Sequence, residues 1–170
     1  WNPAAEGVIF VEQQPAPIAF ITAADTDIQT LAVATTKLSV DFPQVRVVNL
    51  LQLQQQLTID TYAEDVLTAA KVIIVRLIGG QSYWSYGLEV VQETARETGA
   101  VLIVLPGDER PDPTLMSHST ASLGDVDRVW QYLIEGGVDN YRQLLNFIAS
   151  RWLDCECAYR VAEAVPRVGI

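Results

Sequence analysis

The sequence predicts an α/β protein: a doubly wound, mostly parallel sheet in the flavodoxin-like strand order 2-1-3-4, followed by a C-terminal helical hairpin. Up to Leu105, short apolar runs of strand length alternate with segments whose apolar residues recur at helical spacing. This alternation is typical of parallel strands covered by helices, and right-handed crossovers favour the order 2-1-3-4. Beyond Leu105, two further helical stripes are separated by Gly136-Gly137, which predicts the hairpin.

The first two strand–helix pairs are expected within residues 18–70. Residues 18–22 form the first predicted strand, and Asp25 is expected to cap a helix that starts near Asp27. Its buried face should hold Ile28, Leu31, Ala32 and Leu38. Residues 45–50 form the second strand, and Asp60 is expected in the first turn of the next helix, where it favours the helix dipole. That helix should bury Ile59, Tyr62, Ala63, Val66 and Ala70.

The third strand, residues 72–78, is so continuously apolar that it is expected at the centre of the sheet, with both faces buried. Gly79-Gly80 should end it. The next helix is predicted to bury Trp84, Leu88, Val91 and Ala95 and to close at Gly99. Residues 101–105 form the fourth strand. Residues 8–11 are expected to form an extra strand at a sheet edge, although the sequence does not determine which strand they pair with.

The C-terminal third is expected to be a loop followed by two helices. Three prolines between residues 106 and 113 exclude a helix or an interior strand there, so an ordered loop or a lid is predicted. Ser122 and Asp125 resemble a capping box before the first helix, and Asp139 restarts the second. We assign residues 1–153 to one α/β domain, and residues 154–170 to a linker with the truncated start of a further domain.

Composition excludes several classes of partner. The 170 residues include 11 Lys and Arg against 21 Asp and Glu, a formal charge of −10, which argues against nucleic acid and an anionic membrane surface. No apolar run approaches the ~20 residues that cross a bilayer. Cys155 and Cys157 lie one residue apart, a poor arrangement for a structural disulfide. We therefore expect free thiols and a reducing, cytoplasmic location.

Three segments should meet outside the carboxyl ends of the strands, where the strand order reverses: residues 22–27, 79–84 and 106–110. Two carboxylates in the first segment would repel a phosphate, and no glycine-rich phosphate motif is present, so nucleotide binding is not expected. The candidate substrate-binding or docking residues are Asp25, Thr26, Arg76, Gly79, Gly80, Tyr83, Trp84, Asp108 and Arg110.

Structural explanations compete with function at each of these positions. Arg76 lies in a buried strand, so a structural ion pair with Asp25, Asp27 or Asp108 is favoured over ligand contact. The aromatic cluster that includes Tyr83 and Trp84 could anchor the following helix or line a pocket for a planar ligand, and we favour the anchor. A hydrolase built on Asp108 and His118 lacks a visible activated nucleophile. We therefore predict no catalytic residue and no metal site in this chain.

Four motifs together resemble the N-terminal region of the CobN family, the large subunits of cobaltochelatase. They are TAADTD at 22–27, RLIGGQSYWSYG at 76–87, LPGDERPDP at 105–113 and EGGVDN at 135–140, and the resemblance covers residues 18–152. It implies a relation to the H subunit of magnesium chelatase. It also implies ATP-dependent insertion of cobalt into a corrin-ring precursor in cobalamin biosynthesis.

The same resemblance implies the partners. In that family separate AAA+ ATPase subunits handle ATP, so cobalt and Mg-ATP act in the full complex and no cofactor is expected in this fragment. The corrin precursor and the remainder of the large subunit are the other implied partners. The favoured hypothesis is a non-catalytic domain of that subunit; the alternative is a free-standing, flavodoxin-like small-molecule binding module that uses the switch-point crevice.

Overall fold

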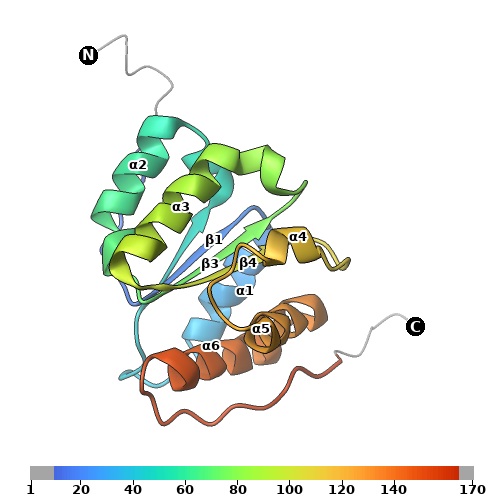
Figure 1. Ribbon diagram of the computed structural model, residues 1–170. Coiled ribbons are helices and arrows are strands. Elements are labelled where there is room, and N and C mark those ends of the chain that lie inside the picture. The colour runs from blue at the N-terminus through green and yellow to red at the C-terminus, as the bar shows by residue number, and fades with distance from the viewer. Residues whose placement is uncertain (1–9, 165–170) are drawn as a thin grey trace.

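The computed structural model describes residues 10–164, and for Gln81 it describes the backbone alone. The centre of the molecule is a four-stranded parallel sheet (Figure 1). The strands are β1 (Ile18–Thr22), β2 (Val45–Asn49), β3 (Val72–Leu77) and β4 (Val101–Pro106). Their order is β2-β1-β3-β4, which confirms the predicted order. β1 and β3 are buried along their whole length, as expected of central strands covered on both faces.

Helices cover both faces of the sheet (Figure 1). One face carries α2 (Gln56–Asp65) and α3 (Ser85–Thr98); the other carries α1 (Asp25–Thr35), α5 (Leu123–Glu135) and α6 (Val138–Trp152). The shorter elements are η2 (Leu50–Leu53), η3 (Leu67–Ala69), η4 (Gln81–Trp84) and α4 (Pro113–Met116). The α5–α6 pair, joined at Gly136-Gly137, is the predicted helical hairpin.

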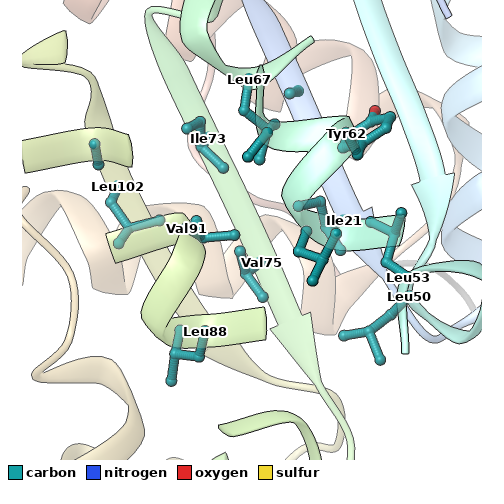
Figure 2. Close-up of a cluster of buried hydrophobic side chains, with 14 of the residues drawn as sticks. Ile21, Leu50, Leu53, Tyr62, Leu67, Ile73, Val75, Leu88, Val91 and Leu102 are labelled. Carbon is teal, nitrogen blue, oxygen red and sulfur yellow. The ribbon is translucent and has the colours of Figure 1, made fainter. Parts of the chain in front are cut away.

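Alternation along the strands divides the core into two clusters. In β3, Ile73 and Val75 face α2 and α3, whereas Val72 and Ile74 face the opposite layer. Figure 2 shows the first cluster, in which Ile73 and Val75 meet Leu88 and Val91 of α3. The two layers are therefore held to the sheet independently, each by its own set of buried side chains.

Helix α1 begins earlier than the sequence predicts. The N-cap is Ala24, whose carbonyl accepts from the backbone N–H groups of Asp27 and Ile28, so Asp25 is the first helical residue and not the cap. The buried face consists of Asp27, Leu31 and Ala34, while the expected Ala32 is exposed. Two differences explain the error: the buried face follows Asp27, Leu31 and Ala34 at helical spacing, which leaves Ala32 outside it, and the helix ends at Thr35, before Leu38.

Helix α2 also starts earlier than expected, at Gln56, so Asp60 lies beyond its first turn. Val66 and Ala70 are buried as predicted but follow the helix, on either side of the η3 turn. At the predicted N-terminal edge strand, residues 8 and 9 lie outside the described residues, and residues 10 and 11 have no regular structure. Gln13 just after them donates to the carbonyl of Val47 in β2, at 3.0 Å.

The proline-rich segment contains a short helix that the sequence analysis excluded. Pro113 is the first residue of α4, where its missing N–H is not needed, and the Asp112 side chain caps that helix by accepting from Leu115 N at 3.0 Å. The Ser122 cap is confirmed, since its hydroxyl accepts from Asp125 N at 3.2 Å. Residues 107–112, between β4 and α4, have no regular secondary structure, as expected of a loop.

The segment after α6 is extended and runs along the α5–α6 hairpin. The backbone N–H of Arg160 donates to Gln143, and that of Glu163 donates to Asn140. Cys155 and Cys157 form a disulfide with their Cα atoms 5.3 Å apart, so the prediction of free thiols is wrong: the chain is bent between them, which brings the two side chains together. The proposed boundary between residues 153 and 154 stays a prediction.

Candidate site at the carboxyl ends of the strands

The register of the sheet brings two polar residues together at the switch point, which is the place at the carboxyl ends of the strands where the strand order reverses. Thr22, the last residue of β1, pairs with Arg76 of β3. Asp27 reaches the same point from the first turn of α1, and Tyr141 reaches it from the first turn of α6. All four side chains are buried, and Asp27 is only 2% exposed.

These four residues form one hydrogen-bonded network centred on Asp27. Arg76 Nη1 lies 2.7 Å from Asp27 Oδ1, and the Tyr141 hydroxyl donates to the same oxygen. The Thr22 hydroxyl donates to Asp27 Oδ2 at 2.8 Å and accepts from Ala24 N at 3.1 Å. Arg76 Nε donates to the carbonyl of Pro106 at 3.2 Å, which ties β4 into the network.

The network explains how a charged pair is tolerated inside the sheet. A buried carboxylate or guanidinium is strongly unfavourable unless it is paired and its remaining hydrogen-bonding capacity is satisfied. Asp27 has both an ion-pair partner and two hydroxyl donors. Burial, together with the neighbouring Asp27 carboxylate, raises the pKa of Tyr141 well above its ordinary value, so the phenol keeps the proton that it donates. Of the three predicted partners for Arg76, the structure selects Asp27.

A cleft of about 300 Å³ opens above this network. Three of the predicted site residues, Thr26, Arg76 and Asp108, line it. Asp27 and Tyr141 form part of its inner wall, and Gly136-Gly137 at the α5–α6 junction lies at its edge. The cleft therefore combines segments from β1–α1, β3, the loop after β4 and the hairpin, as the switch-point rule predicts.

The remaining predicted residues do not line this cleft. Asp25 accepts from Asn49 Nδ2 at 3.2 Å, and Arg110 is exposed with its backbone N–H bonded to Asp108. Gly79 and Gly80 both have positive φ and form the turn that ends β3. Residues 79–84, which were predicted to line the site, therefore do not line this cleft.

Tyr83 and Trp84 are neighbours in sequence but differ in burial. Trp84 is buried, with its indole N–H donating to the carbonyl of Leu53 at 3.0 Å, and it acts as the favoured helix anchor. An added Cβ at Gly87 would lie 2.0 Å from the Trp84 ring, so the glycine is required by this close approach. Tyr83 is half exposed, and its hydroxyl accepts from Gln54 Nε2 at 3.2 Å.

Sequence reasoning missed Thr22 and Tyr141 as members of the network. Tyr141 appears within an apolar helical stripe, and only its hydroxyl distinguishes it from a core phenylalanine. The available signal was the predicted buried charge of Arg76, which demands several partners and not one.

His118 is half-buried in the turn after α4, with Nδ1 3.0 Å from Gln92 Nε2.

The described residues contain neither a cluster of metal ligands nor a membrane-spanning helix. Within residues 10–164, no three His, Cys, Asp or Glu side chains are grouped so that they could hold a metal ion. None of the helices in that range has the length and apolarity required to span a bilayer.

Two curated relatives are similar to most of this chain. The aerobic cobaltochelatase subunit CobN of Pseudomonas aeruginosa is 39% identical over 165 residues, which is 97% of this chain and 13% of that subunit. The CobN subunit of a Sinorhizobium species is 38% identical over 138 residues, which is 81% of this chain and 11% of the subunit. The chain therefore spans only a small part of the length of these relatives.

The fold is also found in a solved structure. The catalytic subunit of cobaltochelatase from Mycobacterium tuberculosis matches with a TM-score of 0.69 and 25% sequence identity, over 88% of this chain and 11% of that one. No protein-family model matches the chain.

Proposed function

Because this chain belongs to the CobN family of cobaltochelatase subunits, of which it spans a small part, we propose that it forms a non-catalytic domain of such a subunit. The observation that carries the proposal is the Asp27–Arg76 pair. Both charged groups at the switch point are bound to each other and to neighbouring hydroxyl or carbonyl groups, so they stabilise the architecture. Metal insertion then belongs to other regions of the subunit.

The complex to which we assign this domain inserts cobalt into a corrin-ring precursor in the cytoplasm. In this proposal AAA+ ATPase subunits hydrolyse Mg-ATP, and the remainder of the large subunit holds metal and macrocycle. The domain contributes contacts at the carboxyl ends of its strands, where Thr26 and Asp108 remain accessible beside the cleft and Arg110 lies on the following loop. Its role is to cover the macrocycle or to dock a partner.

The experiment replaces exposed polar groups at the cleft in the full-length subunit and measures cobalt insertion by the complete complex. Thr26→Ala removes a hydroxyl and Asp108→Asn removes a negative charge, and neither residue belongs to a core cluster. A general acid or base contributes about 10²–10⁴-fold, so for a non-catalytic domain kcat should change by less than about tenfold. Changes confined to KM support substrate cover or docking.

A loss of kcat by the full catalytic factor, with KM and the unfolding transition unchanged, would contradict the proposal. Lys37→Ala is the control, because Lys37 is exposed, follows the C-terminal end of α1 and lies outside the cleft lining. It should leave both kinetic constants unchanged if only the cleft contacts the macrocycle.

The switch-point cleft supports a second candidate function, a small-molecule binding module. Ligand sites commonly occupy about 300–1,000 Å³, and this cleft lies at the lower end of that range. Native mass spectrometry of the freshly purified chain distinguishes the two functions. A co-purified small ligand that Thr26→Ala displaces supports the binding module, whereas a ligand-free chain supports the cover or docking role.

A further inference from the structure

A second concavity of the described residues lies on the other side of the sheet from Asp27. It is a solvent-facing groove of about 710 Å³ between α2 and α3, which run side by side in Figure 1. Its apolar lining comes from Leu57, Ala63 and Val90, with the ring of Tyr86 between them. Leu57 lies in the first turn of α2, and its apolar side chain is 55% exposed.

Carboxylates line both sides of this groove. They are Asp60 and Glu64 on α2, and Glu89, Glu93 and Glu97 on α3. Each series repeats every four residues, so the acidic side chains form a ridge along each helix. Among the described residues that line the groove, Arg96 is the one cation, and it is paired with Glu93.

The groove therefore has a negative potential. Inside it, the Tyr86 hydroxyl donates to both oxygens of Asp60, at 2.7 and 2.9 Å. This hydrogen bond, and the charges of Asp60 and Glu89, raise the pKa of Tyr86 above its ordinary value. Like charges four residues apart also destabilise a helix slightly, so the two ridges are not explained by the stability of α2 and α3.

We propose that this groove binds a cationic amphipathic helix of a second polypeptide. The apolar side of that helix would cover Leu57 and Val90, and its Lys or Arg side chains would pair with the two acidic ridges. This is the helix-in-groove mode of recognition, with charge complementarity setting orientation. The 14 residues of α3 give the groove a length of roughly 21 Å, which matches a partner helix of about four turns.

The described C-terminal segment of this chain does not occupy the groove, because it takes another course. Residues 154–164 run along α5 and α6, where Arg160 bonds to Gln143 and Glu163 bonds to Asn140. Both helices lie across the sheet from the groove. The proposal does not depend on the metal that the complete subunit handles.

The test uses a defined probe, a synthetic amphipathic helix of about 14 residues made only of leucine and lysine, and measures its binding to the chain by fluorescence anisotropy. The groove variant combines Glu89→Gln, Glu93→Gln and Glu97→Gln. The control combines Asp41→Asn, Asp127→Asn and Glu156→Gln, which are exposed and remove the same charge elsewhere. We expect the groove variant to weaken binding about tenfold and the control less than about twofold.

Equal weakening by the two variants would overturn the proposal, because net charge alone would then explain the binding. Leu57→Ser tests the apolar floor with no change of charge, and Leu57 is exposed enough that folding does not depend on it. It should weaken binding several-fold; unchanged binding would also overturn the proposal. A leucine–glutamate peptide of the same length should not bind.

A final arm distinguishes a second polypeptide from the rest of the same chain. The leucine–lysine probe is titrated into the full-length subunit that contains this domain. Affinity close to that of the isolated chain means that the groove is open to another polypeptide, as proposed. Loss of binding in the full-length subunit means that its own remaining residues cover the groove, which would contradict the proposal.

Discussion

The two helical layers use carboxylates in opposite ways. In the α1/α5/α6 layer, Asp27 is buried and accepts from Arg76, Thr22 and Tyr141. In the α2/α3 layer, Glu89 and Glu97 are exposed beside an apolar groove. Burying a charge is unfavourable unless it is fully paired, whereas an exposed charge is solvated and remains available to a partner. The first layer therefore holds the fold together, and the second presents a binding surface.

The largest expected effect comes from breaking the buried network. Asp27→Ala leaves the Arg76 guanidinium buried without its partner, and removing one partner of a buried pair costs about 3–5 kcal/mol. Urea unfolding should show the midpoint falling at an unchanged m-value. The double variant Asp27→Leu with Arg76→Met should recover much of the loss, and a single-variant loss below about 1 kcal/mol would mean that the pair is not effectively buried.

The second prediction compares a glycine from each layer. Gly87→Ala in α3 places a Cβ 2.0 Å from the Trp84 ring, which the bond to Leu53 holds in place. Overpacking of this kind costs about 1–3 kcal/mol. Gly124→Ala in α5 meets no atom within 4 Å and should stabilise the protein by up to about 1 kcal/mol. Thermal unfolding measures both, and the same sign of change in the two variants would refute this explanation.

The third prediction concerns alkaline pH and takes one tyrosine from each layer. Burial raises the pKa of Tyr62 on α2 and of Tyr141 on α6 well above the ordinary value of about 10. Below pH 10 both folded and unfolded chains keep these protons, so the stabilisation is complete. Above it the unfolded chain loses them first, and stability should fall by about 1.4 kcal/mol per pH unit for each tyrosine.

Phenylalanine variants check this assignment. Tyr62→Phe and Tyr141→Phe should each reduce the slope of unfolding free energy against pH above about pH 10. They differ at neutral pH, because Tyr141→Phe removes a donor to the Asp27 carboxylate, whereas Tyr62→Phe removes one to the neutral amide of Gln13. An unchanged slope in both variants would assign the alkaline loss to other groups.

The smallest effect is expected at the groove. Glu89→Gln removes an exposed charge whose neighbours along α3 are also acidic, so stability should stay within about 0.5 kcal/mol of the parent chain, or rise slightly. Asp27→Asn, the equivalent change in the other layer, should destabilise clearly more. Similar losses from the two changes, measured in the same urea series, would remove the contrast between the layers.

Several features of the fold followed directly from sequence patterns. The continuous apolar run at residues 72–78 predicted the central strand, which is observed as Val72–Leu77. The Ser122 cap was placed correctly because capping depends on neighbours within one turn. Helix starts were less accurate. At α1 the acidic residues Asp25 and Asp27 suit both the cap and the first turn, so local pattern alone did not separate the two positions.

The candidate site was predicted less completely. The rule for open parallel sheets identified the correct edge, and Thr26, Arg76 and Asp108 do line one cleft there. The rule did not exclude Gly79, Gly80 or Trp84, because a loop that leaves the right edge can still turn away from the crevice. The disulfide between Cys155 and Cys157 was also missed, since its formation depends on how the chain bends between the two residues.

The sequence by itself determined the strand order, the central strand and the hairpin, because hydrophobic periodicity and right-handed crossovers act over short stretches of chain. Only the tertiary structure decided that Asp27 is the partner of Arg76 and that Tyr141, 114 residues away, donates to the same carboxylate. It also decided that the acidic ridges of α2 and α3 flank one groove. Contacts between distant residues depend on strand register and on how helices pack, and no local pattern contains that information.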